Sequence, residues 1–293
     1  MKTVIIAHYY QRSEVQDIAD FVGDSFAMAK YAASTDADTI VVAGVRFMAE
    51  TVALLNPDKM VLLPEAEAGC SLAANCEAGA FRSFVEAHPD HAVVTYINSS
   101  VDVKALSDIV CTSSNAVSAI MSVPKDQPII FAPDRNLGRW LQQVTGREML
   151  LWDATCEVHQ EFALDKIVAL RDQHPGSKVL AHPECVDAIL EIADVVGSTS
   201  VLLEEVLNHQ HGTYIIATEE GILKSMRAAA PFATLIPAPQ IRANECACGE
   251  CRHMKLTTLV SIERALRTQS ERIVIDEHLR EEATKPLRRM MAL

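Results

Sequence analysis

VIIAHYYQRSEVQDIADFVGDSFAMAKYA (4–32) aligns without a gap with AVVTYINSSVDVKALSDIVCTSSNAVSAI (92–120) and KVLAHPECVDAILEIADVVGSTSVLLEEV (178–206), and all three stretches are 29 residues long. Each has the pattern of a short β-branched strand, a polar turn, an amphipathic helix, a second short strand and a Ser- or Thr-bearing turn that opens another helix. Such a repeat indicates that one supersecondary unit occurs three times in the chain.

The repeat extends beyond these stretches. TIVVAG (39–44), PIIFAP (128–133) and TYIIAT (213–218) are apolar runs typical of buried strands, and each precedes a helical stretch. A fourth strand is expected at KMVLLPEA (59–66), EMLLWDA (148–154) and ATLIPAP (233–239). Strands that alternate with helices form parallel sheets joined by right-handed crossovers. We therefore expect an α/β fold of three pseudo-threefold-related αβα domains, each with a four-stranded parallel sheet: residues 1–88, 89–174 and 175–293, the last with the C-terminal helices.

Length and composition limit the possible classes of protein. The 293 residues are 49% hydrophobic, enough for two or three small domains with their own cores. The formal net charge of −13 disfavours a nucleic-acid or membrane-surface partner and favours a soluble chain. The start of the chain lacks a signal-peptide cleavage site, and no stretch reaches transmembrane length. We expect a cytoplasmic protein, whose cysteines are then metal ligands, catalytic thiols or buried apolar groups rather than disulfides.

The residues directly after each strand form the functional shortlist, because ligands of open parallel sheets bind beyond the carboxyl ends of the strands. Polar side chains follow the first strand of each repeat, hydroxyls follow the second strand at equivalent positions, and cysteines follow the fourth. The three sets are His8, Tyr10, Tyr96, Asn98, His182 and Glu184; Ser25, Ser113 and Thr199; and Cys70, Cys156 and the triplet ECACGEC (245–251).

The triplet alone is ambiguous. Cys246, Cys248 and Cys251 suit half of a zinc site, a disulfide, a redox pair or one arm of an iron–sulfur site. A four-ligand zinc ribbon would need a second C-x-x-C pair, and the other cysteines are single and far apart. If the three domains face a common axis, one cysteine from each converges there. Three thiolates on a 4Fe–4S cubane leave one iron without a protein ligand, which can act as a Lewis acid.

Motifs along the whole chain resemble those of the quinolinate synthase family. They are AHYYQRSEVQ (7–16), GDS (23–25), GCSLA (69–73), TYINSS (95–100), CTSSNA (111–116), CEVH (156–159), AHPEC (181–185), GSTS (197–200) and CGECRHMK (248–255). The resemblance implies a triangular arrangement of three domains around a central 4Fe–4S cluster held by one cysteine per domain. It also implies transferase and dehydratase chemistry in NAD biosynthesis: condensation of iminoaspartate with dihydroxyacetone phosphate to quinolinate, with loss of phosphate and two waters.

The resemblance also implies roles for residues. The cluster ligands would be Cys70, Cys156 and Cys251, the last chosen because it stands three residues before Met254. We expect Glu184 to shuttle protons, His8 and Tyr10 to handle the triose oxygens, and His182 to assist substrate binding. The substrate-binding residues would be Ser25, Tyr96, Asn98, Ser113, His159, Ser198 and Thr199.

Some of these assignments have alternatives. His159, three residues after Cys156, is also suited to support the cluster from outside its ligand shell. Cys246 and Cys248 remain candidates for a redox pair, and Cys76, Cys111 and Cys185 are expected to be buried structural thiols. The chain departs from the family pattern at Tyr9 and at the pair Arg252–His253. Neither departure is at a residue to which a role is assigned.

The hydroxyls of Ser25, Ser113 and Thr199 are each expected at a helix start. There they would either cap backbone N–H groups or help to bind the anionic groups of the substrates.

Two other functions fit the same residues. One is an open-iron 4Fe–4S dehydratase that acts on a hydroxy acid, and the other is a non-catalytic binding protein whose cysteines hold a structural metal. By family resemblance, an aspartate oxidase or dehydrogenase would supply the iminoaspartate.

Overall fold

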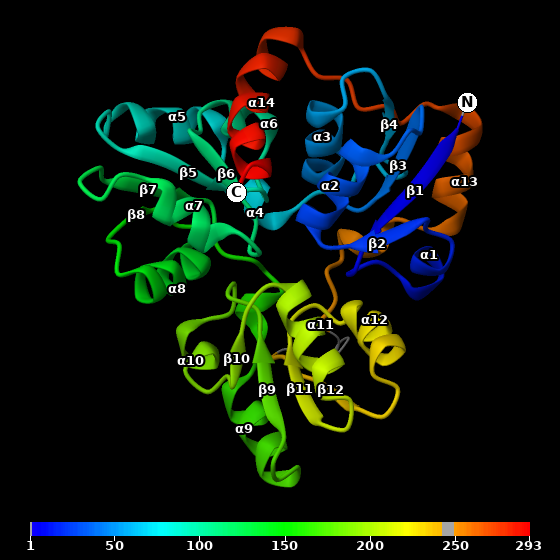
Figure 1. Cartoon of the computed structure of the whole chain (residues 1–293), viewed down its shortest axis with the longest axis vertical. Helices are drawn as coiled ribbons and strands as arrows, with labels where there is room; N and C mark the ends of the chain where they lie inside the picture. Colours follow the sequence, from blue (N-terminus) through cyan, green and yellow to red (C-terminus); the bar gives the residue numbers. More distant parts are fainter. Residues whose placement is uncertain (1, 242–248) are drawn as a thin grey trace.

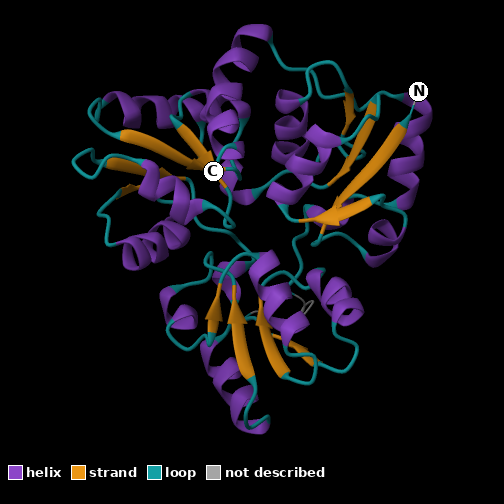
Figure 2. Cartoon of the chain, in the orientation of Figure 1, coloured by secondary structure: helices purple, strands orange, loops and turns teal. Residues whose placement is uncertain are grey.

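Three four-stranded sheets form the framework of the chain (Figures 1 and 2). The computed structural model describes residues 2–241 and 249–293. The first sheet contains β1 (Thr3–His8), β2 (Phe21–Gly23), β3 (Thr39–Ala43) and β4 (Met60–Leu62); the second contains β5 (Ala92–Tyr96), β6 (Ile109–Cys111), β7 (Ile129–Ala132) and β8 (Leu150–Leu151); the third contains β9 (Lys178–Ala181), β10 (Val195–Val196), β11 (Thr213–Ala217) and β12 (Thr234–Pro237). Every neighbouring pair is parallel, and the orders are β2-β1-β3-β4, β6-β5-β7-β8 and β10-β9-β11-β12. The predicted fold class is therefore confirmed.

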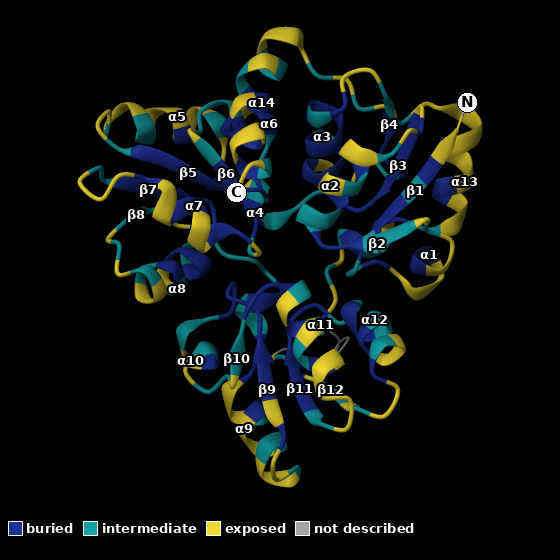
Figure 3. Cartoon of the chain, in the orientation of Figure 1, coloured by how far each residue is buried: buried dark blue, intermediate teal, exposed yellow. Residues whose placement is uncertain are grey.

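The three units lie around a common centre, toward which the strand arrows of all three sheets point (Figure 1). The strands are mostly buried, and the exposed residues lie on the outer helices and loops (Figure 3). The helices are α1 (Ser13–Asp17), α2 (Ser25–Ser34), α3 (Arg46–Leu55), α4 (Ser71–Ala74), α5 (Ala78–Glu86), α6 (Val101–Ala105), α7 (Ala116–Ser122), α8 (Arg135–Thr145), α9 (Leu164–Gln173), α10 (Asp187–Leu190), α11 (Thr199–Asn208), α12 (Ile222–Ala229), α13 (Leu259–Thr268) and α14 (Glu277–Met291). None of the described helices is long and apolar enough to cross a membrane.

An aspartate in the same position of each repeat explains why the three stretches align without a gap. Its carboxylate accepts the backbone N–H of the second aligned residue of the first strand, and its own N–H donates to the carbonyl of that residue. The pairs are Asp20 with Ile5 at 2.7 Å, Asp108 with Val93 at 2.9 Å, and Asp194 with Val179 at 2.8 Å. These paired bonds join the two ends of the strand–helix–strand turn and fix its length, because an insertion would displace the aspartate from its partner.

The helices that cover equivalent faces of the sheets come from shifted places in the sequence. Phe81 of α5 packs on the second sheet, and Ile167 of α9 packs on the third. The equivalent face of the first sheet is covered by Ile262 of α13, near the other end of the chain. The predicted domain boundaries at 88/89 and 174/175 follow the sequence repeat, and they remain a prediction. In the structure, one helix from each sequence repeat packs on the sheet of the next repeat, and α13 of the last repeat packs on the first sheet.

The first two units share one hydrophobic core. Ile6 of β1, Val94 of β5 and Leu287 of α14 belong to the same buried cluster, and α14 packs against α3, α6 and β6. Figure 1 shows α14 lying between these two units. The third sheet has its own two clusters, one on each face.

Candidate functional site

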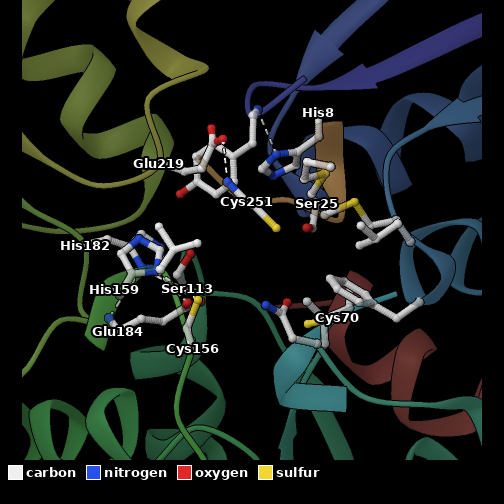
Figure 4. A pocket seen from close by; sticks show the side chains of 18 of the residues that line it. His8, Ser25, Cys70, Ser113, Cys156, His159, His182, Glu184, Glu219 and Cys251 are labelled. Atoms are coloured by element: carbon white, nitrogen blue, oxygen red, sulfur yellow. Dashed lines mark hydrogen bonds and ion pairs between the residues drawn. The ribbon is translucent and has the colours of Figure 1, made fainter. Parts of the chain in front are cut away.

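A pocket lies where the three units meet, and residues from all three line it (Figure 4). Nearly all of the predicted site residues line this pocket: His8, Tyr10, Ser25, Cys70, Tyr96, Asn98, Ser113, Cys156, His159, His182, Glu184, Thr199 and Cys251. Ser198 does not line it; its hydroxyl instead accepts the N–H of Val201 and caps α11. Residues that follow the carboxyl ends of the parallel strands therefore meet at this pocket, as expected, although they are up to 243 positions apart in the sequence (8 to 251).

Three thiols project into this pocket, one from each unit. Cys70 immediately precedes α4, Cys156 follows β8, and Cys251 stands three residues before the short 3₁₀ helix Met254–Leu256. None of the three forms a disulfide, and Figure 4 shows their sulfur atoms directed toward the same space. Burial raises the pKa of Cys70 to about 12 and that of Cys251 to about 11, so the bare thiols keep their protons at neutral pH.

This donor set fits an iron–sulfur cluster. Cys70, Cys156 and Cys251 line the same pocket, and burial, Glu184 and the other two thiols raise the pKa of Cys156 well above its ordinary value. Thiolates in such a place need a metal cation to stabilise them. Among the described residues no fourth cysteine lines the pocket; Cys76, Cys111 and Cys185 are buried elsewhere. Cys246 and Cys248 lie outside the described residues.

His8 and His182 occupy equivalent places and make the same local hydrogen bond. The N–H of Tyr10 donates to Nδ1 of His8 at 3.1 Å, and the N–H of Glu184 donates to Nδ1 of His182 at 3.4 Å. Burial lowers the pKa of His8 to about 4 and that of His182 to about 3, so both rings are neutral at pH 7. A neutral ring that accepts at Nδ1 carries its hydrogen on Nε2. Each ring therefore has an N–H donor on Nε2.

Glu184 is the centre of a buried hydrogen-bond network. Its Oε1 accepts the hydroxyl of Tyr96 at 2.6 Å, and its Oε2 lies 2.9 Å from Nδ1 of His159. Burial alone would raise the pKa of Glu184, but the His159 and His182 rings and the two hydrogen bonds hold it well below its ordinary value. The ring of His159 also stacks on His182, with ring centroids 4.8 Å apart.

His159 further links this network to one of the thiols, since its Nδ1 lies 3.3 Å from Sγ of Cys156. The donor atoms of Cys156, His159 and Glu184 lie within 4.8 Å of one another, a grouping that also suits a single metal ion.

Four residues of the site were missed by sequence reasoning: Asp24, Thr218 and Glu219, which are buried, and Lys255, which is partly buried. Glu219, which lines the pocket, accepts the N–H of Cys251 at 3.0 Å and the ammonium of Lys255 at 2.8 Å. Lys255 also donates to the carbonyl of Tyr10 at 2.7 Å, which ties the loop bearing Cys251 to the first unit. Burial raises the pKa of Glu219 to about 7. Thr218 and Glu219 directly follow β11, so the carboxyl-end rule would have found them had it been applied to the third strands.

The helix starts differ from the prediction in two respects. Ser25 and Thr199 are the first residues of α2 and α11, but Ser113 lies three positions before α7, so the predicted helix start at Ser113 is wrong. Asn115 explains the delay, because its side chain accepts the N–H of Thr112 at 2.8 Å and closes a turn before the helix begins. The caps of α2 and α11 come from the preceding side chains, Asp24 and Ser198. The Ser25 and Thr199 hydroxyls therefore do not serve as these caps.

The described wall of the pocket is acidic rather than cationic. Among the described residues that line it, the charged ones are the acids Asp24, Glu157, Glu184 and Glu219, with no lysine or arginine. An anionic ligand in this pocket would have to be held by hydroxyls, imidazole N–H groups, backbone N–H groups or a bound metal.

The fold and the site define an α/β protein of three like units with a thiol-lined acid–base pocket where the units meet. The sequence profile described as "Quinolinate synthetase A protein" matches residues 1–292. Proteins named quinolinate synthase from Microcystis aeruginosa and Nostoc punctiforme are each 50% identical over the 293 residues, which cover 100% of this chain and 91% and 90% of theirs. One from a Synechococcus species is 49% identical, covering 100% of this chain and 91% of its own. The chain belongs to the quinolinate synthetase A family, an enzyme family, as the motifs predicted.

Proposed function

We propose that the chain is a quinolinate synthase of NAD biosynthesis that condenses iminoaspartate with dihydroxyacetone phosphate, releasing quinolinate, phosphate and two waters. The observation that carries this proposal is the convergence of one thiol from each unit on a pocket walled by buried histidines, tyrosines and a glutamate. The relatives that bear the name quinolinate synthase support the reaction class. By family resemblance, an aspartate oxidase or dehydrogenase would supply the iminoaspartate. The reaction would take place in the cytoplasm.

Cys70, Cys156 and Cys251 would hold a 4Fe–4S cluster. When bound through three thiolates, such a cluster supplies an iron without a cysteine ligand, a Lewis acid for the departure of hydroxide. Glu219 supports this arrangement from the protein side, because it fixes the backbone N–H of Cys251. His159 supports it at Cys156.

The remaining wall suits the proton transfers and the anion binding that the reaction needs. Glu184, a carboxylate at neutral pH that contacts Tyr96 and His159, would take and return protons together with them. His8 and Tyr10 would hold the triose oxygens, and His182 would assist binding. The substrates carry two carboxylates and one phosphate. Ser25 and Thr199, with the backbone N–H groups of α2 and α11, would receive anionic groups, and Ser113 and Asn98 lie on the same wall.

Alanine at Cys70, Cys156 or Cys251 is expected to abolish the brown absorbance of the cluster. Each thiolate is one of only three protein bonds to the cluster, and alanine offers no ligand. The measurement is the visible absorbance and the iron and sulfide content after anaerobic purification, with four of each per chain expected in the unchanged protein. The same preparation should form quinolinate from the two substrates.

Three matched variants serve as controls. C76A removes a buried thiol outside the pocket, and C246A and C248A remove the neighbours of Cys251; all three should keep the cluster. If C248A loses the cluster while C251A keeps it, the ligand choice is wrong. One metal per chain without sulfide would point instead to a single ion on Cys156, His159 and Glu184.

A further inference from the structure

A fully buried lysine lies directly behind the pocket wall. Lys104 of α6 is 0% exposed and does not line the pocket itself. Its ammonium donates to the backbone carbonyl of Ser99 and lies over the ring of Phe47, 5.6 Å from the ring centroid. Phe47 lines the pocket, and so does Asn98, the neighbour of Ser99. The ammonium of Lys104 is therefore separated from the pocket by one layer of side chains.

The repeat shows that a hydrogen-bond donor at this place does not need a charge. Gln16 is the equivalent of Lys104 in the first repeat (16 + 88 = 104). Gln11 is likewise the equivalent of Ser99 (11 + 88 = 99). The amide of Gln16, also buried, donates to the carbonyl of Gln11 at 2.8 Å. The second repeat makes the same bond with a charged group, although burying a charge costs free energy that an amide avoids.

The surroundings of Lys104 offset its charge only in part. Burial lowers the pKa of Lys104 to about 8, so the side chain is largely an ammonium at pH 7. The carboxyl of Glu50 opposes this shift, but within residues 2–241 and 249–293 the ammonium forms no ion pair. Burial also raises the pKa of Glu50, which makes it a weaker counter-ion. Part of the positive charge therefore acts on the neighbouring pocket.

We infer that Lys104 is a specificity-determining residue, whose buried positive charge makes the pocket favour anionic ligands. The charged residues among the described lining are acids, which repel the carboxylates and the phosphate of the proposed substrates. A charge about 10 Å from a ligand, across the Phe47 ring, changes a binding constant by roughly tenfold per negative charge at an effective dielectric constant near 20. This deepens the proposed function, on which its kinetic test rests, because it names a group that offsets the acids of the wall.

The test separates the charge of Lys104 from its hydrogen bond. K104Q keeps a donor, as Gln16 does in the first repeat, and K104M keeps neither donor nor charge. Both variants should raise the KM for dihydroxyacetone phosphate at least about tenfold at pH 7, with kcat within about threefold, because the charge acts on binding. Cluster absorbance should be unchanged. If K104Q binds this substrate normally and only K104M is impaired, Lys104 is a structural donor and the inference is wrong.

The matched control is K59Q. Lys59 is also a lysine whose ammonium donates to backbone carbonyls, those of Ala32 at 2.8 Å and Thr35 at 2.7 Å. It directly precedes β4, whereas the pocket lies beyond the carboxyl ends of the strands, and it does not line the pocket. K59Q makes the same change of charge and should leave the KM unchanged. An equal rise of the KM in K59Q would be an effect of net charge alone and would overturn the inference.

A readout without substrate separates this inference from the proposed function. In the metal-free chain, Cys70 is alkylated with anionic iodoacetate or with neutral iodoacetamide, which is of similar size, and mass spectrometry gives the rate at this residue. The ratio of the two rates reports the electrostatic potential in the pocket, because the reactivity of the thiol itself cancels. K104Q and K104M should lower this ratio about tenfold, and K59Q should not.

An unchanged ratio in both Lys104 variants would overturn the inference, even if quinolinate synthase activity is present. If that activity is absent, the proposed function fails and the ratio still decides the role of Lys104.

Discussion

At the scale of single residues, local backbone geometry already decides which histidine nitrogen can act. The His-x-Tyr and His-x-Glu sequences at 8–10 and 182–184 each turn a backbone N–H onto Nδ1 two residues earlier. The sequence therefore encodes the tautomer of both rings as well as their position. This local bond recurs because the two segments occupy the same place in their repeats.

The buried neutral state of His8 predicts a dependence of stability on pH. The folded ring has a pKa of about 4, below the ordinary value of 6.5. Between these values the unfolded chain binds more protons than the folded chain, so the free energy of unfolding falls as the pH is lowered. For His8 the loss from pH 6.5 to 5 is about 2 kcal/mol. We expect the melting temperature of H8N, measured by circular dichroism, to fall less between pH 7 and 5 than that of the unchanged protein.

The melting temperature of H182N should also depend less on pH than that of the unchanged protein, because burial also lowers the pKa of His182. Parallel curves for H8N and the unchanged protein would contradict a neutral, buried His8.

Site residues could be predicted from the sequence where they occupy equivalent positions of the repeat. They could not be predicted where their role depends on a contact between distant parts of the chain. His8, Glu184, Cys70 and Cys156 follow strands at repeated positions, so one rule found them, whereas the family resemblance selected Cys251 from its triplet. Asp24 was passed over although it adjoins Ser25, because its partners Ser114 and Ser200 come from the other two repeats. No local pattern shows that these three side chains meet.

At the scale of elements, the helix starts of α2 and α11 separate capping from ligand binding. Asp24 and Ser198 cap the helices, and the next residues, Ser25 and Thr199, face the pocket. The sequence predicted both starts but left open whether the hydroxyls of Ser25 and Thr199 cap the helices or bind anions, and the structure gives the caps to the preceding residues. A one-residue difference is beyond what strand and helix patterns resolve, because helix boundaries read from sequence shift by one or two residues.

These helix starts yield a prediction in which binding and stability separate. S25A and T199A should each raise the KM for one substrate more than for the other, with little change in melting temperature, because neither hydroxyl provides a cap. S198A removes the cap of α11 and should cost about 1 kcal/mol of the free energy of unfolding. The checks are steady-state kinetics and urea denaturation. If S25A and T199A lose stability like S198A and bind both substrates normally, the anion sites lie elsewhere.

The sheets could be predicted strand by strand, but the partners of their outer helices could not. Strand pairing within a repeat follows from the crossover rule and from local sequence. The packing of α13 on the first sheet joins positions more than 190 residues apart, such as Ile262 and Ala7 (262 − 7 = 255). An amphipathic helix shows which of its faces is buried but not which sheet receives it.

At the scale of the whole molecule, the three units are held together unequally. The first two share a continuous hydrophobic core that α14 completes. The described contacts of the third unit at the pocket are instead largely polar: Thr218 to Tyr10, Lys255 to Tyr10, and Ser200 to Asp24. The ring of Tyr10 adds apolar contact with the core of the third unit. These directional bonds align the third unit at the pocket, in addition to the apolar packing of α9 on the third sheet and of α13 on the first.

Asp24 makes the most concentrated of these connections. One of its oxygens accepts the N–H of Ala27 at 2.8 Å, and the other accepts the hydroxyls of Ser114 at 2.8 Å and Ser200 at 2.6 Å. Its carboxylate thus caps a helix of the first unit and binds the second and third units. Asp24 is 6% exposed, so water cannot easily replace these partners.

We expect D24A to lower the free energy of unfolding by about 3 kcal/mol, the sum of one lost cap and two hydroxyl bonds to a charged acceptor. S114A and S200A should each cost about 1 kcal/mol, and adding S200A to D24A should cost little more, because the partner of Ser200 is already gone. Urea denaturation gives these values. D276A, which removes the exposed cap of α14, is the matched control at about 1 kcal/mol. If D24A costs no more than D276A, Asp24 is only a cap, and other contacts must hold the third unit over the pocket.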